Sequence, residues 1–340
     1  MKMLLSSKKL HSGLGFLISS VILIWLFARM DWTQVLDALY KVKLWPFIPA
    51  IVLFFLNAIF RAWRWRYLLP NGEKIRLKVL YDCLMIGNLA SYVLPLRAGE
   101  FVRPFMLSRK SGIQFSTTFI SIVIERFFDL SLVLLSFALM VLFVPGVPEI
   151  VYQGAYALSV IAIAILIFMI IGSFFPETVM RVSMFFISIL PRSLHERMEK
   201  FIRGLLTGGA VLRQGKRLVI LILLSLLVWL FIYIFYQVLI ALFAIKGSFW
   251  IGVAIGVITA LAVAAPSAPG FIGVYQAGCV AALVLFGINE EVAVAFSIIT
   301  HAFQFIMVLI AGFVSLMSNN LSFADIKNQA HEIEDTETVS

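Results

Sequence analysis

The chain has 340 residues, of which 62% are hydrophobic and 13% are charged, and its mean hydropathy is +1.02. A soluble domain is about half apolar and a quarter charged, so this composition excludes a single soluble globule, a disordered chain and a fibrous protein. The net charge of +9 comes mostly from short basic segments beside apolar runs, which is typical of cytoplasmic loops. No basic domain that could lie on nucleic acid is evident, and nucleic-acid binding is not expected.

The first apolar run, about residues 12–29, follows a basic N-terminus. It resembles a signal peptide, but no small-residue cleavage site follows it, and we predict an uncleaved first transmembrane helix. Residues 31–45 then alternate polar and apolar positions at helical spacing and carry a tryptophan near each end. This pattern predicts an amphipathic helix at the level of the lipid headgroups.

Further apolar runs follow along the chain, and a full membrane span needs about 20 residues. They cover about 46–62, 79–94, 115–144, 153–174, 217–244, 249–265, 272–287 and 291–318. Two regions, 79–110 and 249–287, are interrupted by proline and glycine. The breaks are Pro95 and Gly99 in the first region and Pro266, Pro269, Gly270 and Gly273 in the second. Non-helical backbone at membrane depth persists only where protein or a water-filled cavity surrounds it, so we predict two re-entrant hairpins within an all-α polytopic helical bundle.

The distribution of basic residues supports this topology. If both broken regions return to the side from which they enter, cytoplasmic segments hold 22 of the 27 Lys and Arg residues. Six of these lie in 61–78 and four in 97–110. A full crossing by 79–94 would place the basic stretch 97–110 outside, against the positive-inside rule. We therefore expect both termini in the cytoplasm.

The same topology predicts the domain organisation. One transmembrane domain covers 1–318, with half-repeats at about 46–144 and 217–318. A basic amphipathic linker over about 175–216 joins the halves, and it either lies among headgroups or forms a solvated cytoplasmic loop. The acidic tail, 319–340, is predicted to be disordered and cytoplasmic.

The two broken regions resemble each other. LASYVLPLRAGEFVRP and LAVAAPSAPGFIGVYQ both have Leu-Ala before a P-x3-G motif, and each precedes a long helix with polar residues at its centre. The first hairpin is expected to enter from the cytoplasm and the second from outside. This arrangement predicts an inverted repeat with a site near the bilayer midplane, a plan shared by many transporters. Glu125 and His301, each about 15 Å along its helix, would lie near that midplane.

Charged residues of the first half form the strongest candidate site. They are Arg97, Glu100, Arg103, Glu125, Arg126 and Asp129. Arginine suits phosphate or carboxylate, and a charge at the bilayer centre costs about 2.5 to more than 10 kcal/mol unless partners or water offset it. Two compatible interpretations stay open: an ion-pair network that joins Glu125 or Asp129 to Arg97 or Arg103, and a site for a substrate phosphate. A third is that the turn after Pro95 simply meets water at the interface.

The second half supplies polar, mostly uncharged candidates: Ser267, Tyr275, Gln276, His301 and Gln304, with Asn57, Asp82, Asn88, Ser91 and Tyr92 as weaker ones. His301 either relays a proton or is a hydrogen-bonded buried histidine. The sequence has no GxSxG, HExxH or P-loop motif and no metal-ligand cluster, so we expect no enzymatic activity, no metal and no cofactor. Cys83 and Cys279 are expected to be free and buried.

These motifs resemble the transmembrane region of lysylphosphatidylglycerol synthases over most of residues 10–320. NLASYVLPLRAGEFVRPFMLSRKSG, VIERFFDL and PSAPGFIGVYQAG carry the resemblance. The match places the family's first motifs on Arg97, Gly99, Glu100, Arg103, Glu125, Arg126 and Asp129. Gln276 and His301 stand where many relatives have Glu and Arg, which removes charge. The chain ends about twenty residues after its last predicted helix, and we expect it to lack the fused aminoacyltransferase domain.

The resemblance implies lipid translocation across a bacterial or archaeal cytoplasmic membrane. We expect a flippase that moves a phospholipid or a polyprenyl-phosphate-type lipid, with the phosphate headgroup as the ligand of the arginines. Two alternatives stay open: a membrane-embedded transferase that acts on a lipid head, and a non-transporting accessory subunit that partners a lipid- or glycan-synthesis enzyme.

Overall fold

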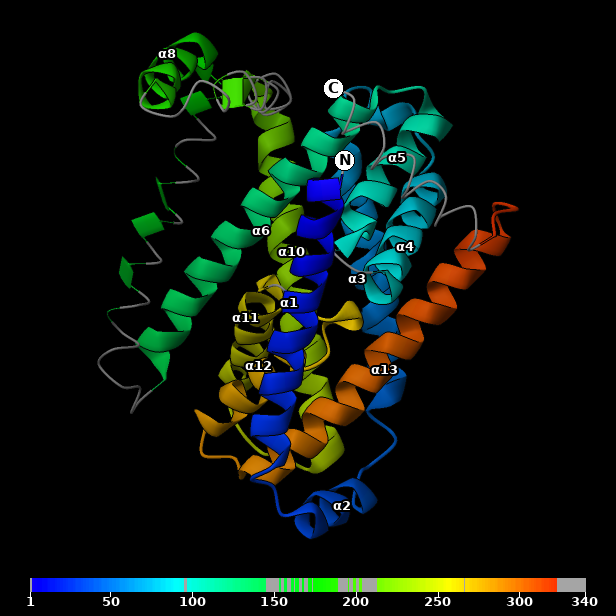
Figure 1. Ribbon diagram of the computed structural model, residues 1–340, viewed down its shortest axis with the longest axis vertical. Coiled ribbons are helices and arrows are strands. Elements are labelled where there is room, and N and C mark those ends of the chain that lie inside the picture. The colour runs from blue at the N-terminus through cyan, green and yellow to red at the C-terminus, as the bar shows by residue number, and fades with distance from the viewer. Residues whose placement is uncertain are drawn as a thin grey trace.

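The computed structural model describes residues 2–94, 97–144, 174–188, 213–265 and 267–322, with isolated residues between 153 and 203; for 2–12, 14 and 15 it describes only the backbone. Throughout these residues the regular structure is helical, as predicted (Figure 1). The α-helices are α1 Lys2–Phe27, α2 Trp32–Tyr40, α3 Phe47–Leu68, α4 Leu77–Val93, α5 Gly99–Ser111, α6 Phe115–Phe143, α8 Pro176–Ile187, α10 Gly215–Leu239, α11 Trp250–Ala264, α12 Val274–Val284 and α13 Glu290–Met317.

Among the described residues, four helical segments are long and apolar enough to cross a membrane: Phe47–Leu68, Phe115–Phe143, Gly215–Phe243 and Glu290–Met317. The end of α1 and α2 together make a fifth candidate, although the chain bends by 90° between them. The helices of the two broken regions are shorter, and the longest of them, α4, has 17 residues. Such a helix rises about 26 Å, less than the roughly 30 Å of a hydrocarbon core.

A helix, α2, forms within the segment 31–45 that was predicted to be an amphipathic helix, but it ends at Tyr40, and its level in a membrane stays a prediction. Its N-cap is Asp31, whose carboxylate accepts hydrogen bonds from the backbone N–H of Thr33 and the side-chain amide of Gln34, both at 2.9 Å. The bond from Gln34 and then that from Thr33 lower the pKa of Asp31. Val35 is buried and Tyr40 is 88% exposed, so the helix has one packed face and one open face.

The four short helices form two hairpins. In Figure 1, α4 and α5 (cyan) lie in the upper half of the molecule, and α11 and α12 (yellow to gold) lie in the lower half. Within the first hairpin the helices approach closely, because a Cβ atom on Gly99 would stand 1.7 Å from the carbonyl oxygen of Gly87. In the second, a Cβ on Gly278 would stand 2.9 Å from Cα of Thr259. The glycines therefore permit the close approach of the two helices in each hairpin. The re-entry of the hairpins into a membrane and their inverted symmetry stay predictions.

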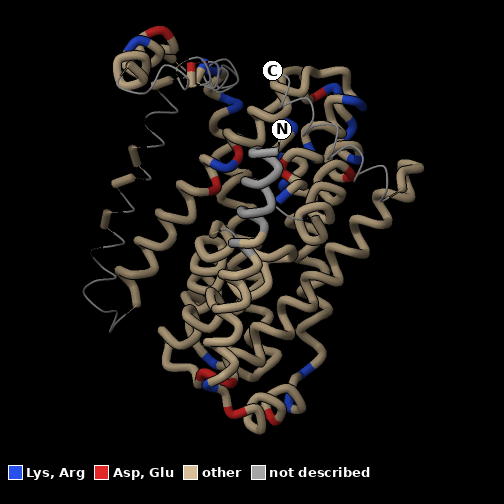
Figure 2. Tube along the Cα trace, in the orientation of Figure 1, with Lys and Arg blue, Asp and Glu red and all other residues tan. Residues whose placement is uncertain are grey.

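Two apolar cores occupy opposite ends of the molecule. One surrounds the α4–α5 hairpin and includes Trp65, Leu84 and Leu89. The other surrounds the α11–α12 hairpin and includes Val257 and Leu283. Figure 2 shows charged residues at the two ends of the helices and in a further group in the upper part, with few charges elsewhere. The region between the two cores is where polar side chains from both halves meet.

Several predictions made from the sequence lie outside the described residues. They concern Pro95, Pro266, half of the apolar run 153–174, most of the linker beyond residue 188, and the tail from residue 323. The described start of the linker is helical, at α8. It buries Val179 and Ile187 and exposes Phe185 and Phe186.

Candidate functional site

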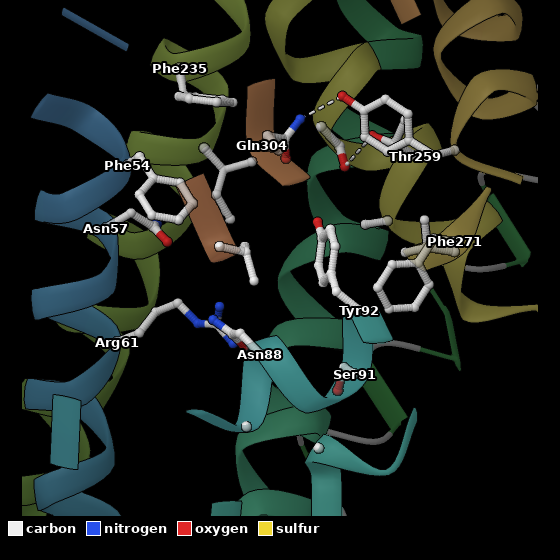
Figure 3. Close-up of a pocket in the computed structure, with 18 of the residues that line it drawn as sticks. Phe54, Asn57, Arg61, Asn88, Ser91, Tyr92, Phe235, Thr259, Phe271 and Gln304 are labelled. Atoms are coloured by element: carbon white, nitrogen blue, oxygen red, sulfur yellow. Dashed lines mark hydrogen bonds between the residues drawn. The ribbon is translucent and has the colours of Figure 1, made fainter. Parts of the chain in front are cut away.

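A cavity of about 340 Å³ lies between the tips of the two hairpins, with walls from α3, α10 and α13 (Figure 3). Its lining combines charged, neutral polar and aromatic side chains. The charged residues are Arg61, Arg97, Glu100, Arg103 and Arg126, and the neutral polar ones are Asn57, Asn88, Ser91, Tyr92, Tyr236, Thr259, Tyr275 and Gln304. The apolar part includes Phe54, Trp229, Phe231, Phe235 and Phe271. Both halves of the chain therefore contribute to one cavity.

Glu125, on α6, is the centre of the charged network and is completely buried. Arg103 of α5 donates to both of its carboxylate oxygens, at 3.0 and 2.9 Å. Arg64 lies 3.3 Å away and Arg126 3.8 Å away. A paired, bidentate arginine is what allows a carboxylate to stay ionised away from water. The predicted link between Glu125 and Arg103 is formed.

Asp129 lies one turn further along α6 and holds a second arginine. Arg64 donates to its two carboxylate oxygens at 2.6 and 3.1 Å, and the indole N–H of Trp229 donates to one of them at 3.1 Å. Arg64 is only 1% exposed, and it also reaches the Ser225 hydroxyl at 3.3 Å. Arg64 therefore joins α3, α6 and α10 in one polar layer.

Arg61 and Arg64 lie on a helix that extends beyond the apolar run from which it was predicted. Residues 61–78 were predicted to form a cytoplasmic segment, and α3 continues through its first part to Leu68. The two arginines, three residues apart, face the charged network from this last part of α3. The sequence did not predict that α3 continues to Leu68, because the apolar run stops near residue 62. The partners that stabilise these two charges lie on other helices, far away in the sequence. Without these two residues, the segments predicted to be cytoplasmic still hold 20 of the 27 Lys and Arg residues, and their placement stays a prediction.

Arg103 is oriented by an aromatic ring as well as by Glu125. Its guanidinium lies 3.9 Å from the ring centroid of Trp65. An indole face attracts a cation in this position. The Trp65 N–H in turn donates to the Ser121 hydroxyl at 2.8 Å. Arg103 is therefore held from two sides, as a positioned part of the cavity wall.

Arg126 and Glu100 form a looser pair at the cavity. Arg126 is within 3.8–4.0 Å of Glu100, Glu125 and Asp129, distances longer than a hydrogen bond. Its side chain is 45% exposed, and that of Glu100 is 38% exposed. Arg126 is therefore attracted to the network while its donors stay accessible.

Arg97 forms no ion pair with Glu125 or Asp129 within the described part of the chain, so of the two arginines named for that link it is Arg103 that makes it. Arg97 lies at the tip of the first hairpin with a left-handed φ of 53°. Its guanidinium stands 5.5 Å from the ring of Phe271, at the tip of the second hairpin, where φ is 61°. Its Nη2 atom is buried and has no hydrogen-bond partner among the described residues.

The tips of the two hairpins also touch through their backbones. Gly270 has φ 71°, and a Cβ there would lie 3.3 Å from the carbonyl oxygen of Tyr92. The rings of Tyr92 and Phe271 meet edge to face, with centroids 5.4 Å apart. Gly273, with φ 90°, starts α12. The predicted breaks at Gly99, Pro269, Gly270 and Gly273 therefore lie where the chain turns between the short helices.

His301 of α13 is hydrogen-bonded at both ring nitrogens. The Gly273 N–H donates to the Gln276 side-chain oxygen at 2.7 Å, so the Gln276 amide nitrogen is the atom that faces Nδ1 of His301, at 2.9 Å. Nδ1 therefore accepts, and Nε2 donates to the carbonyl oxygen of Gly270 at 2.8 Å. The ring of Tyr275 stacks on the imidazole at 4.4 Å. This geometry favours a neutral, structural histidine that fixes the second tip over a proton relay.

Around the cavity the positive charges exceed the negative ones. The network has five arginines, at 61, 64, 97, 103 and 126, and three carboxylates, at 100, 125 and 129. Over the described residues, no group of three or more His, Cys, Asp or Glu is placed to hold a metal ion. Cys83 and Cys279 are buried free thiols, as expected. The site is therefore built to attract an anion through arginine.

These observations define a class: an all-helical, multi-pass membrane protein with a polar cavity between two broken helical hairpins. The chain belongs to the family of the lysylphosphatidylglycerol synthase transmembrane region, whose sequence pattern matches residues 13–312. It is also 26% identical over 311 residues to a "UPF0104 membrane protein" of Methanothermobacter thermautotrophicus, an alignment that covers 87% of this chain and 90% of that protein. No solved structure matches the chain significantly.

Proposed function

We propose that this protein moves a phosphate-bearing lipid between the leaflets of the cytoplasmic membrane. The observation that carries the proposal is the cavity, in which arginine side chains and aromatic walls face the same space. A phospholipid or a polyprenyl phosphate joins the same two chemistries, an anionic phosphate and a long apolar chain. Arginine is suited to the first because its planar fork donates to two phosphate oxygens at once.

The network separates arginines that hold the site from arginines that remain available. Arg64 and Arg103 are engaged by Asp129 and Glu125 through paired hydrogen bonds. Arg61, Arg97 and Arg126 line the cavity without such pairs. A phosphate that binds to these three offsets the excess positive charge at little cost to the held pairs. The proposal includes no catalytic step.

The proposed path uses the two hairpins as opposed re-entrant elements of an inverted repeat. Each would bring polar backbone to mid-membrane from its own side, which is the usual position of a transporter site. In this placement both termini are cytoplasmic, and α2 lies at the outer face of the cytoplasmic membrane.

A cysteine at position 40 tests this orientation. We expect Tyr40→Cys, on the exposed face of α2, to react with a membrane-impermeant maleimide in intact cells. Arg109→Cys, on the exposed end of α5, should react only after the cells are made permeable, and the buried native thiols should stay silent. The opposite labelling pattern would show that the orientation is reversed.

Transport itself is tested with proteoliposomes that contain a fluorescent phosphatidylglycerol. Dithionite bleaches only the outer leaflet, so further bleaching reports the arrival of lipid from the inner leaflet. We expect the wild-type protein to accelerate this phase and Arg97→Ala/Arg126→Ala to slow it at least fivefold, because each lost charged hydrogen bond is worth about 1.5–3 kcal/mol. Arg29→Ala, an exposed arginine remote from the cavity lining, is the matched control. Equal rates for the double variant and the wild type would contradict the proposal.

A further inference from the structure

The end of the cavity away from Arg61 is polar but uncharged. In Figure 3, Arg61 and Asn88 lie at one end, Gln304 and Thr259 lie at the other, and Tyr92 lies between them. Tyr236 and Tyr275, which also line the cavity, lie within hydrogen-bonding reach of Gln304 and complete this neutral end. It thus presents hydroxyl and amide groups, the donors and acceptors that hydroxylated ligands use.

Several of these groups have hydrogen-bonding capacity left over. Gln304 donates from its amide nitrogen to the Tyr275 hydroxyl at 2.6 Å and to the Thr300 carbonyl oxygen at 3.3 Å, so its side-chain oxygen is not used by either bond. The Tyr92 hydroxyl points into the cavity (Figure 3) and has no hydrogen bond to the described part of the protein. A ligand that both donates and accepts would satisfy this end, whereas an alkyl chain would leave these groups unpaired at a cost.

The neutral end is poorly suited to an ammonium group. Glu100 is the one carboxylate among the described lining residues, and it belongs to the arginine end. Aromatic faces can also bind cations, but three of the aromatic rings that line the cavity already have a partner. Arg97 covers Phe271, His301 covers Tyr275, and Phe303 stacks on Phe235. A cationic head would therefore enter a site that already carries excess positive charge.

We propose that the cavity is a two-part headgroup site, in which the arginine end takes the phosphate and the neutral end takes an uncharged, hydroxyl-bearing group attached to it. This inference rests on the proposed function and narrows its substrate class. The preferred lipids are phosphodiesters of glycerol, inositol or a sugar, with a net negative charge. Lipids whose phosphate carries an amine, including aminoacylated ones, are disfavoured. Gln304 is the central specificity-determining residue.

Equilibrium binding tests the inference independently of transport. Purified protein in detergent is titrated with the dioctanoyl forms of phosphatidylglycerol, phosphatidylinositol, phosphatidylethanolamine and phosphatidylcholine, and the thermal unfolding midpoint is followed. We expect each of the first two to bind at least tenfold more tightly than either amine lipid, and the ratio between the first two to distinguish glycerol from inositol. Equal or tighter binding of an amine lipid, or no binding by any of the four, overturns the inference. Lipid transport without headgroup preference would overturn it while leaving the proposed function intact.

A single substitution at the neutral end sharpens the test. Gln304→Glu places a carboxylate there with almost no change of shape. We expect the preference for phosphatidylglycerol over phosphatidylethanolamine to fall at least tenfold, through weaker binding of the first and stronger binding of the second. Gln237→Glu is the matched control, because the Gln237 side-chain oxygen accepts from the Gly252 N–H outside the lining and a carboxylate can do the same. An unchanged preference in Gln304→Glu would contradict the assignment of this end.

Discussion

Arg103→Met is expected to lower the free energy of unfolding by about 3–5 kcal/mol, the cost of removing one partner from a buried ion pair. Arg103 is buried and donates two hydrogen bonds to Glu125, which has no contact with solvent. Methionine keeps much of the volume but leaves the carboxylate with only the longer contacts to Arg64 and Arg126. Reversible unfolding in mixed micelles, followed by tryptophan fluorescence, measures the loss.

The double variant Arg103→Met/Glu125→Leu separates stability from function. Replacement of a whole buried ion pair by apolar side chains is often neutral, so we expect most of the lost stability to return while lipid transport stays impaired. Lys41→Met is the matched control, since Lys41 pairs with Asp37 and both side chains are largely exposed, and such pairs contribute about 0–1 kcal/mol. If the double variant were as unstable as Arg103→Met alone, the pair would not be the stabilising unit that the geometry indicates.

Arg61→Met is expected to weaken lipid binding and transport about ten- to a hundredfold with little change in stability. The nearest carboxylate oxygen to its guanidinium is on Glu125, at 3.9 Å, and no hydrogen bond joins Arg61 to another described residue. Its side chain is 22% exposed and lines the cavity beside Asn88 (Figure 3). A lost hydrogen bond to a charged group costs about 1.5–3 kcal/mol, which corresponds to that range of affinity. Thermal unfolding with and without dioctanoyl phosphatidylglycerol measures both quantities.

Arg64→Met provides the comparison for this prediction. Arg64 is three residues away on the same helix but is held by Asp129 through two hydrogen bonds, so its loss should destabilise the protein even without lipid. A variant of Arg61 that unfolds as readily as the Arg64 variant, or that binds lipid normally, would show that Arg61 belongs to the structural network and not to the ligand site.

The helical architecture was predictable because hydropathy and proline–glycine breaks are local properties of the sequence. α6 begins at Phe115 and α13 at Glu290, within a residue of the apolar runs that predict them. The pairing of Glu125 with Arg103 was also predictable, since a buried carboxylate needs a cation and the preceding broken hairpin supplies one. The depth of the hairpins in the bilayer cannot be derived from hydropathy alone. Their re-entrant placement is part of the proposed function.

The rest of the site was harder to predict because it depends on packing between distant parts of the chain. Arg64 meets Asp129 across 65 residues of sequence, and the spacing of polar residues along one helix does not reveal such a contact. Asn88 and Tyr92 were weak candidates because one polar side chain in an apolar run has no distinguishing pattern. The sequence left open whether Arg97 or Arg103 pairs with the buried carboxylates, and it could not predict the left-handed backbone of Arg97 or its contact with Phe271.

That same backbone has an energetic consequence. A residue other than glycine with left-handed φ is strained by about 1–3 kcal/mol, and both Arg97 and Phe271 are in this state, in contact with each other. Glycine at either position would relieve the strain but would remove the guanidinium or the ring that joins the tips. The observed conformation therefore contains backbone strain at the place where the tips of the two hairpins touch. A rearrangement that separates the two tips would therefore release strain at both residues.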